Sequence, residues 1–159
     1  MICRRAIAQD IPGIHHLLDQ VLMVHYAGRP DLFKPNTRKY TDEELAQIIA
    51  DDDSPVFVAV DEDAAPGELL AHCFCQVQDF SGSNNMQPIR TLYIDDLCVD
   101  EACRGRHVGS ALYDHVIAFA REGGFYNVTL NVWSCNPNAM AFYESRGLLP
   151  YKVGMEKIL

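Results

Sequence analysis

One stretch of the chain combines glycines and basic residues in a pattern that suits a phosphate group. It runs from Cys103 to Leu112 and reads Cys-Arg-Gly-Arg-His-Val-Gly-Ser-Ala-Leu. A strand-like segment precedes it and helical periodicity follows, so several backbone amides gather at a helix start, where the helix dipole adds positive charge. Arg104 and Arg106 add full charges. The stretch fits neither a Walker A loop nor Gly-x-Gly-x-x-Gly, and taken alone an ordinary tight turn explains it better.

A second stretch, about thirty residues further on, favours a functional interpretation of the first stretch over an ordinary tight turn. It runs from Asn136 to Gly147 and reads Asn-Pro-Asn-Ala-Met-Ala-Phe-Tyr-Glu-Ser-Arg-Gly. Asn136 and Tyr143 are seven residues apart, which is two helical turns, so both are expected on one face of a helix.

Together the two stretches resemble the motifs of the GNAT superfamily of acetyl-CoA-dependent N-acetyltransferases. The family's phosphate loop, Gln/Arg-x-x-Gly-x-Gly/Ala, is matched in register by Arg104, Val108 and Gly109. The following motif, Asn-x-x-Ala-x-x-x-Tyr-x-x-x-Gly, is matched in full by Asn136, Ala139, Tyr143 and Gly147. The resemblance is strong from residue 93 to 148. One position departs from it, because His107 stands where the family has its first loop glycine, which puts the strength of coenzyme binding in question.

The resemblance implies a mixed α/β fold with a splayed, mostly antiparallel central sheet and about four helices. It implies acetyl-CoA as co-substrate, with pantetheine lying between two splayed strands. The main chain of Leu97, Cys98 and Val99 would bond pantetheine, and Asn136 would contact it. The pyrophosphate would be held around the loop residues Arg104, Gly105, Arg106, His107, Val108, Gly109 and Ser110. Tyr143 would lie near the sulfur and protonate the leaving thiolate.

The run Leu92-Tyr93-Ile94-Asp95-Asp96-Leu97-Cys98-Val99 resembles the spermidine/spermine and thialysine acetyltransferase branch, which has an acidic pair just before the coenzyme-binding positions. By position Asp95 matches the proposed base of that branch. Adjacent strand residues face opposite sides, so only one of the pair is expected in the acceptor cleft, with Asp96 buried and hydrogen-bonded. Tyr26 is a further acceptor-site candidate. Histidines 15, 16 and 25 are interpreted as surface or satisfied core residues.

Amine attack on a thioester requires no covalent enzyme intermediate, so direct transfer in a ternary complex is expected. A ping-pong route through Cys98 is a lesser alternative. The six cysteines match no zinc motif, and no metal is expected. Cys73 and Cys75, two apart in a strand-like run, should point to one face.

The chain carries 22 acidic and 13 basic residues, a net charge of −9, which disfavours nucleic acid and anionic membranes as partners. Nine acids and no base lie between Asp42 and Asp63, interpreted as a solvated helix flank and hairpin tip. The overall charge suits a cationic acceptor such as a polyamine, a diamine or a lysine-like amino acid. A protein or peptide acceptor remains open, as does an acyl-CoA-binding module without turnover.

The length of 159 residues suits one domain over 1–159. No apolar run is long enough to span a bilayer and no signal-peptide pattern is present, so a cytoplasmic location is expected. Periodicity predicts strands over 2–7, 56–60, 68–80, 91–99, 128–132 and 153–159. It predicts helices that start at Asp10, at the capping box Thr41–Glu44, after residue 107 and at Asn136. A homodimer is expected, to which the last strand could contribute.

Overall fold

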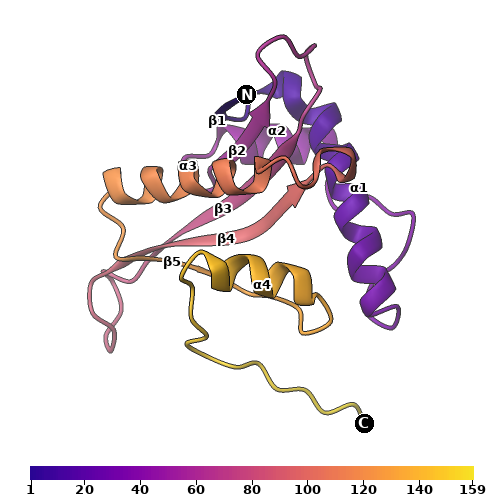
Figure 1. The fold of residues 1–159 in the computed structure, drawn as a ribbon. Coiled ribbons are helices and arrows are strands. Elements are labelled where there is room, and N and C mark those ends of the chain that lie inside the picture. The colour runs from indigo at the N-terminus through magenta and orange to yellow at the C-terminus, as the bar shows by residue number, and fades with distance from the viewer.

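The computed structural model describes residues 1–159 as a five-stranded sheet with helices on both faces (Figure 1). The strands are β1 (Ile2–Arg5), β2 (Val56–Val60), β3 (Ala71–Asp79), β4 (Arg90–Val99) and β5 (Asn127–Leu130), and they lie side by side in that order. Neighbours from β1 to β4 are antiparallel, whereas β4 and β5 are parallel. The predicted mixed α/β fold with a mostly antiparallel sheet is confirmed.

Four helices complete the fold: α1 (Ile11–Gly28), α2 (Asp42–Ala50), α3 (Val108–Glu122) and α4 (Pro137–Ser145). Two short 3-10 turns, η1 (Ala8–Asp10) and η2 (Glu101–Cys103), precede α1 and α3. Because β4 and β5 are parallel, the chain has to cross over between them, and α3 forms this connection.

The core is divided by the sheet into two layers, as side-chain alternation along β3 requires. Cys73 and Cys75 point to the α3 face, as predicted, with their sulfurs 3.7 Å apart. Phe74, between them, points to the opposite face and packs with α1 and α2. The central strands therefore contribute side chains to both layers of the core, and these contacts hold the sheet between the helices on its two faces.

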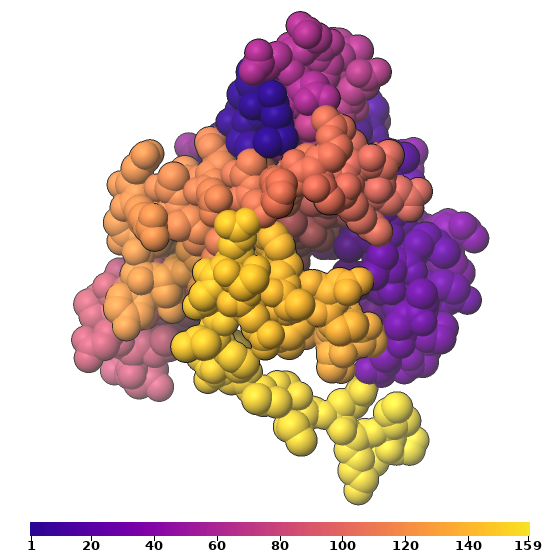
Figure 2. Space-filling model, viewed as in Figure 1, coloured from indigo at the N-terminus to yellow at the C-terminus, as the bar shows by residue number.

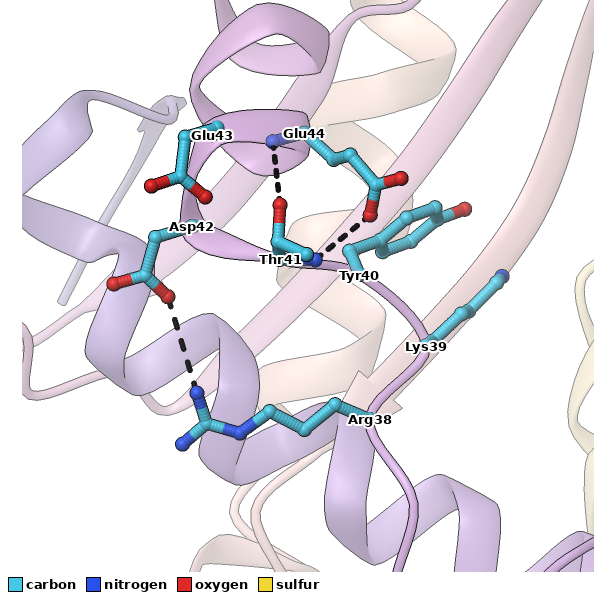
Figure 3. Close-up of a pocket in the computed structure, with 7 residues that line it drawn as sticks. All are labelled: Arg38, Lys39, Tyr40, Thr41, Asp42, Glu43 and Glu44. Atoms are coloured by element: carbon cyan, nitrogen blue, oxygen red, sulfur yellow. Dashed lines mark hydrogen bonds and ion pairs between the residues drawn. The ribbon is translucent and has the colours of Figure 1, made fainter.

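Helix α2 begins with the predicted capping box (Figure 3). The Thr41 hydroxyl accepts a hydrogen bond from the Glu44 amide at 3.2 Å, and the Glu44 carboxylate accepts one from the Thr41 amide at 2.8 Å. Two orphan donors at the helix start are thereby satisfied. The shallow pocket around this turn is polar and open, and it is lined by residues 38–44.

Helix α1 starts after Asp10, its N-cap residue, as predicted. The Asp10 carboxylate does not bond the helix start; it accepts from the Ile7 amide at 2.9 Å and forms a two-pronged ion pair with Arg4 at 2.7 and 3.0 Å. One expectation about the last element is wrong. Residues 153–159 form no strand, because no neighbouring strand pairs with them. None of the four helices is apolar enough over a sufficient length to cross a membrane.

Candidate active site

The sheet opens between β4 and β5, and this opening is the central feature of the site. Their parallel pairing runs from Thr91–Asn127 to Ile94–Leu130 and then stops. Strand β4 continues to Val99, bonded to β3 alone. The expected splay of these two strands is therefore present, and it leaves one backbone edge of β4 without a strand neighbour from residue 95 onward.

A β-bulge lies at the point where the strands part. The β3–β4 register shifts so that Cys75 faces Ile94 whereas Phe74 faces Asp96, and Asp95 is the extra residue. A bulge bends its strand and redirects side chains. As a result Asp95 and Asp96 line the same cavity, and the expectation that only one of them would do so is wrong. Simple alternation fails because it assumes an unbroken pleat.

The open edge of β4 carries Leu97, Cys98 and Val99, the positions predicted to hold pantetheine. The Cys98 side chain is buried towards α1, and its sulfur donates to the Leu17 carbonyl at 3.4 Å. Burial raises the pKa of the Cys98 thiol to about 12. Because the thiolate is the nucleophilic form, this thiol is poorly suited to the ping-pong route.

The turn that follows β4 places an uncapped helix start beside this edge. No side chain caps α3, so the amides of its first turn, from Val108 to Ser110, have no intrahelical acceptor. Arg104 takes part in no ion pair, and Arg106 lies 3.9 Å from Asp61. These donors and charges form the kind of site that binds phosphate.

Gly109 allows α3 to pack closely on β4. A Cβ atom at this position would lie 3.0 Å from Cγ2 of Val99, closer than ordinary van der Waals contact. The glycine therefore sets the short distance between the helix start and the open strand edge.

His107 keeps the backbone shape that the family's glycine would adopt. Its φ is 61° and its ψ is 15°, in the left-handed region, and its side chain is exposed. Histidine is enriched among the few non-glycine residues found there. The substitution thus preserves the turn, at a cost of about 1–2 kcal/mol in backbone strain.

A cavity of about 1660 Å³ extends from this open edge between α1, the loop after it, β5 and α4. Figure 2 shows an opening between the purple residues of α1 and the yellow-orange α4. Asp95, Asp96 and Tyr143 all line the cavity, although they come from β4 and α4. The structure therefore brings the predicted acid and base together in one cleft.

The two aspartates have different surroundings. Asp95 is partly exposed, and its Oδ2 lies 3.0 Å from Nζ of Lys39. The Asp96 side chain is only 10% exposed, and its Oδ2 lies 3.8 Å from Nε2 of His72, too far for a hydrogen bond. Burial opposes ionisation of Asp96, but His72, Lys39 and His25 outweigh it and lower the pKa of this carboxyl. Asp96 is thus a buried carboxyl group whose ionised form is favoured by the basic side chains around it.

Tyr143 meets the physical requirements of a proton donor. Burial, followed by the nearby Cys73 and Asp96, raises the pKa of Tyr143, so its hydroxyl is protonated throughout the neutral range. Its ring packs on Phe142 with centroids 5.2 Å apart. Asn136 supports the helix, since its Oδ1 caps α4 by accepting from the Ala139 amide at 3.2 Å. The Asn136 side chain is therefore engaged through its oxygen as the N-cap of α4.

Three aromatic rings lie together in the lining of the cavity. His25 lies 5.0 Å from Phe33 and 6.3 Å from Trp133, centroid to centroid. His25, interpreted from the sequence as a surface or satisfied residue, is half-buried in the lining of this cavity. Tyr26, the further acceptor-site candidate, does not line the cavity, whereas its neighbour His25 does. Phe33 and Lys39 were missed, since the irregular segment 29–40 carries no motif.

The sequence is similar to known acetyltransferases. The family model "Acetyltransferase (GNAT) family" matches residues 22–148. Glucosamine 6-phosphate N-acetyltransferase 1 of Oryza sativa subsp. japonica is 34% identical over 113 residues, which are 71% of this chain and 62% of that protein. The probable glucosamine 6-phosphate N-acetyltransferase 2 of the same species is 30% identical over 122 residues, 72% of this chain and 69% of that protein. The chain thus spans about two thirds of the length of these relatives.

Solved structures of similar proteins share the fold of this chain. A tetramutant of the BH1408 protein from Bacillus halodurans superposes with a TM-score of 0.92 at 30% identity over 100% of both chains. Glucosamine-6-phosphate N-acetyltransferase from Arabidopsis thaliana, at 22% identity, shares the fold with a TM-score of 0.71 over 99% of this chain and 97% of its own. The curated relatives are named for an amino-sugar phosphate rather than for the polyamine branch that the aspartate pair favours. With a family model covering most of its length, the chain belongs to the GNAT family of acetyltransferases, a family of acyltransferase enzymes.

Proposed function

We propose that this protein transfers an acetyl group from acetyl-CoA to the primary amine of a small acceptor. The observation that carries the proposal is the open edge of β4. It runs from the uncapped start of α3 to the cavity that holds Tyr143 and the two aspartates. A phosphate-binding turn, an unpaired strand edge and an acid–base pair thus lie in one continuous path.

The residues present suit acetyl-CoA, which supplies the thioester when bound. The amides from Gly105 to Ser110, with Arg104 and Arg106, would hold the pyrophosphate. The unpaired main chain of Leu97 to Val99 would bond the pantetheine amides, as one strand bonds another. His107 maintains the left-handed turn on which the first of these groups depends.

The chemistry assigned to the side chains follows from their surroundings. Asp95 would accept the proton of the acceptor ammonium, directly or through water, because its Oδ2 is held by Lys39 while the other oxygen is uncommitted. The acceptor nitrogen bonds to the acetyl carbon as the carbon–sulfur bond breaks. Tyr143 would give its proton to the departing sulfur and regain one as the nitrogen loses its second proton, through water in the cleft. Asp96 would stabilise the ammonium before attack.

For the acceptor, we propose an amine that also carries an anionic group, such as an amino-sugar phosphate. The cavity lining is balanced in charge, with four basic and four acidic side chains: Arg29, Lys34, Lys39, Lys152, Asp95, Asp96, Glu144 and Glu156. The acidic residues from Asp42 to Asp63 do not line it. The acceptor therefore meets cations as well as carboxylates, and the names of the rice relatives support the same class.

A polyamine or lysine-like acceptor is the second candidate. The adjacent carboxylates of Asp95 and Asp96 favour it, because two ionised carboxylates in one cleft attract a multiply charged cation. Lys39 weighs against it, since its ammonium lies on Asp95 and would repel such a ligand.

The test is acetyl-CoA-dependent thiol release over a panel of amines. Glucosamine 6-phosphate and glucosamine form a matched pair that differs only in the phosphate; spermidine, lysine and a short peptide complete the panel. We expect kcat/KM at least tenfold higher for the phosphate than for glucosamine, with Lys39→Met removing most of that difference. Turnover of spermidine but not of the sugars would transfer the assignment to the polyamine class. Coenzyme-induced thermal stabilisation without any turnover would support the binding module.

A further inference from the structure

One histidine in the protein interior has no hydrogen-bond partner. His72 lies on β3 with no exposed surface, and neither Nδ1 nor Nε2 of its ring is bonded. Its neighbours across the sheet are Val58 of β2 and Cys98 of β4. A buried polar group without a partner destabilises the folded state, and an apolar residue of similar size would avoid that loss. Packing alone therefore does not account for a histidine at this position.

The imidazole lies next to a carboxylate of the acceptor cleft. His72 and Phe74 share one face of the sheet, with ring centroids 5.1 Å apart, and Phe74 lies opposite Asp96 in the β3–β4 register. Nε2 of His72 is 3.8 Å from Oδ2 of Asp96, and no other basic side chain comes within 4.0 Å of that carboxylate. Asp96 lines the cavity, whereas His72 does not. His72 therefore approaches Asp96 from the protein interior rather than from the cleft.

The other titratable groups around Asp96 do not share this enclosed position. Three of them line the cavity from α1, its following loop and α4, and three lie on β3 and β4: His25, Lys39, Tyr143, Cys73, Asp95 and Cys98. Lys39 is already paired with Asp95 at 3.0 Å, and burial lowers the pKa of His25. Among the basic groups only His72 is closed off from the cleft, so it stays beside Asp96 whatever occupies the cavity.

We propose that His72 is a positioning residue for the acceptor amine, because it fixes the Asp96 carboxylate from the interior by donating a hydrogen bond from Nε2 to Oδ2 when the acceptor binds. Such hydrogen bonds are often long in a free enzyme and shorten in the substrate complex. An acceptor in the cleft excludes water, and the lower local dielectric strengthens the bond. Oδ1 of Asp96 is then presented to the acceptor ammonium, beside Asp95. The inference rests on the proposed function, in which Asp96 meets that ammonium.

His72→Leu tests this role, because leucine has a similar volume and no polar atom. We expect the acceptor KM to rise about tenfold at pH 7, since a hydrogen bond to a charged group is lost, with kcat changed less than about threefold. His72→Gln keeps an N–H donor and should recover most of the lost affinity. His72→Met, a second apolar variant with a flexible side chain, should behave like His72→Leu. Both apolar variants remove two buried, unpartnered nitrogens, so neither should melt below the wild type.

The titration of Asp96 provides a second measurement that needs no turnover. It is followed by NMR of the aspartate carboxyl carbons, with the signal identified by its absence from Asp96→Asn. Burial raises the pKa of this carboxyl and His72 lowers it. Loss of the imidazole should therefore move the titration higher, by about one pH unit. The acid limb of kcat/KM for the acceptor should move in the same direction.

His15→Leu is the matched control. His15 is also buried, but its Nε2 lies 2.7 Å from Oδ1 of Asp42, and it does not line the cavity. This variant should melt at a lower temperature and keep the wild-type acceptor KM and Asp96 titration. In an Asp96→Asn background, His72→Leu should cause no further change in acceptor KM, because its effect passes through that carboxylate.

An acceptor KM and an Asp96 titration that both stay unchanged in His72→Leu and His72→Met overturn the proposal. A KM effect of the same size in the Asp96→Asn background overturns it as well, since His72 would then act through another group. If the wild type acetylates no amine, the proposed function fails instead. The Asp96 titration then still decides whether His72 acts on this carboxylate.

Discussion

The hydroxyl of Tyr143 offers the most direct test of the proposed chemistry. Tyr143→Phe removes one oxygen atom and keeps the ring packed against Phe142 and Tyr113, whose centroids lie 5.2 and 6.3 Å away. The fully buried side-chain polar atoms that lack a hydrogen-bond partner are both in His72. The Tyr143 hydroxyl is therefore not a buried, unsatisfied group, and it faces the cavity. Its removal should therefore leave stability unchanged within about 1 kcal/mol.

The size of the kinetic effect follows from the role and the surroundings of this group. Positioned general acids contribute about 10²- to 10⁴-fold. Because burial raises the pKa of Tyr143 and makes it a weaker acid, we expect the lower end of that range. A hundredfold loss in kcat corresponds to about 2.7 kcal/mol in the activation free energy. The coenzyme dissociation constant should change less than threefold, because the hydroxyl is assigned to the leaving sulfur alone.

The assay is continuous thiol release under saturating coenzyme and acceptor, with coenzyme affinity taken from calorimetry. Tyr113→Phe is the matched control, since Tyr113 is a buried tyrosine of the same ring cluster and does not line the cavity; its kcat should stay within twofold. Because the Tyr143 hydroxyl stays protonated, its ionisation should not lower the wild-type kcat between pH 7 and 9. Wild type and Tyr143→Phe should therefore have the same pH dependence over that range. If Tyr143→Phe keeps more than a third of the wild-type kcat, the assignment of the acid is refuted.

Three further predictions concern stability and reactivity. His107→Val should lower the unfolding free energy by about 1–2 kcal/mol in thermal denaturation, because a β-branched residue is poorly tolerated at a φ of 61°, whereas His107→Asn should be nearly neutral. Asp96→Asn should be less stable than wild type at pH 7. The folded pKa of Asp96 lies below its ordinary value, so its stabilisation is complete above about pH 4 and fades as pH falls further; melting curves from pH 2.5 to 7 should therefore converge at the acid end. Cys98→Ala should keep kcat within twofold in the thiol-release assay, and wild-type activity at pH 7 should resist iodoacetamide at this thiol, because burial keeps it protonated.

Part of the site was predictable because its signals are local. The turn before α3 and the cap at Asn136 depend on residues within one or two helical turns, so their spacing in the sequence is their spacing in space. The strand that carries Asp95 and Asp96 was predicted for a similar reason, since residues 91–99 are rich in β-branched and apolar side chains. Helix starts, strand identities and the order of elements belong to the same class of local signals.

The acceptor side was not predictable, because contacts distant in sequence create it. Lys39 reaches Asp95 across 56 residues, and His25 and Phe33 meet Trp133 across about a hundred. No motif marks these residues, and only the packing of α1 and its following loop beside β4 brings them to the cavity. The bulge in β4 is similar, since a register shift is defined by two strands and cannot be seen in one.

The C-terminal residues show where local and tertiary information separate. Their alternating pattern predicts a strand, and the chain there is extended and amphipathic, but a strand exists only when a second backbone bonds to it. By itself the sequence determined the family motifs, the capping box of α2 and the succession of helices and strands along the chain, because these depend on short-range geometry. The tertiary structure decided which side chains share the cleft with Tyr143 and left residues 149–156 unpaired, because both outcomes depend on neighbours that linear spacing does not specify.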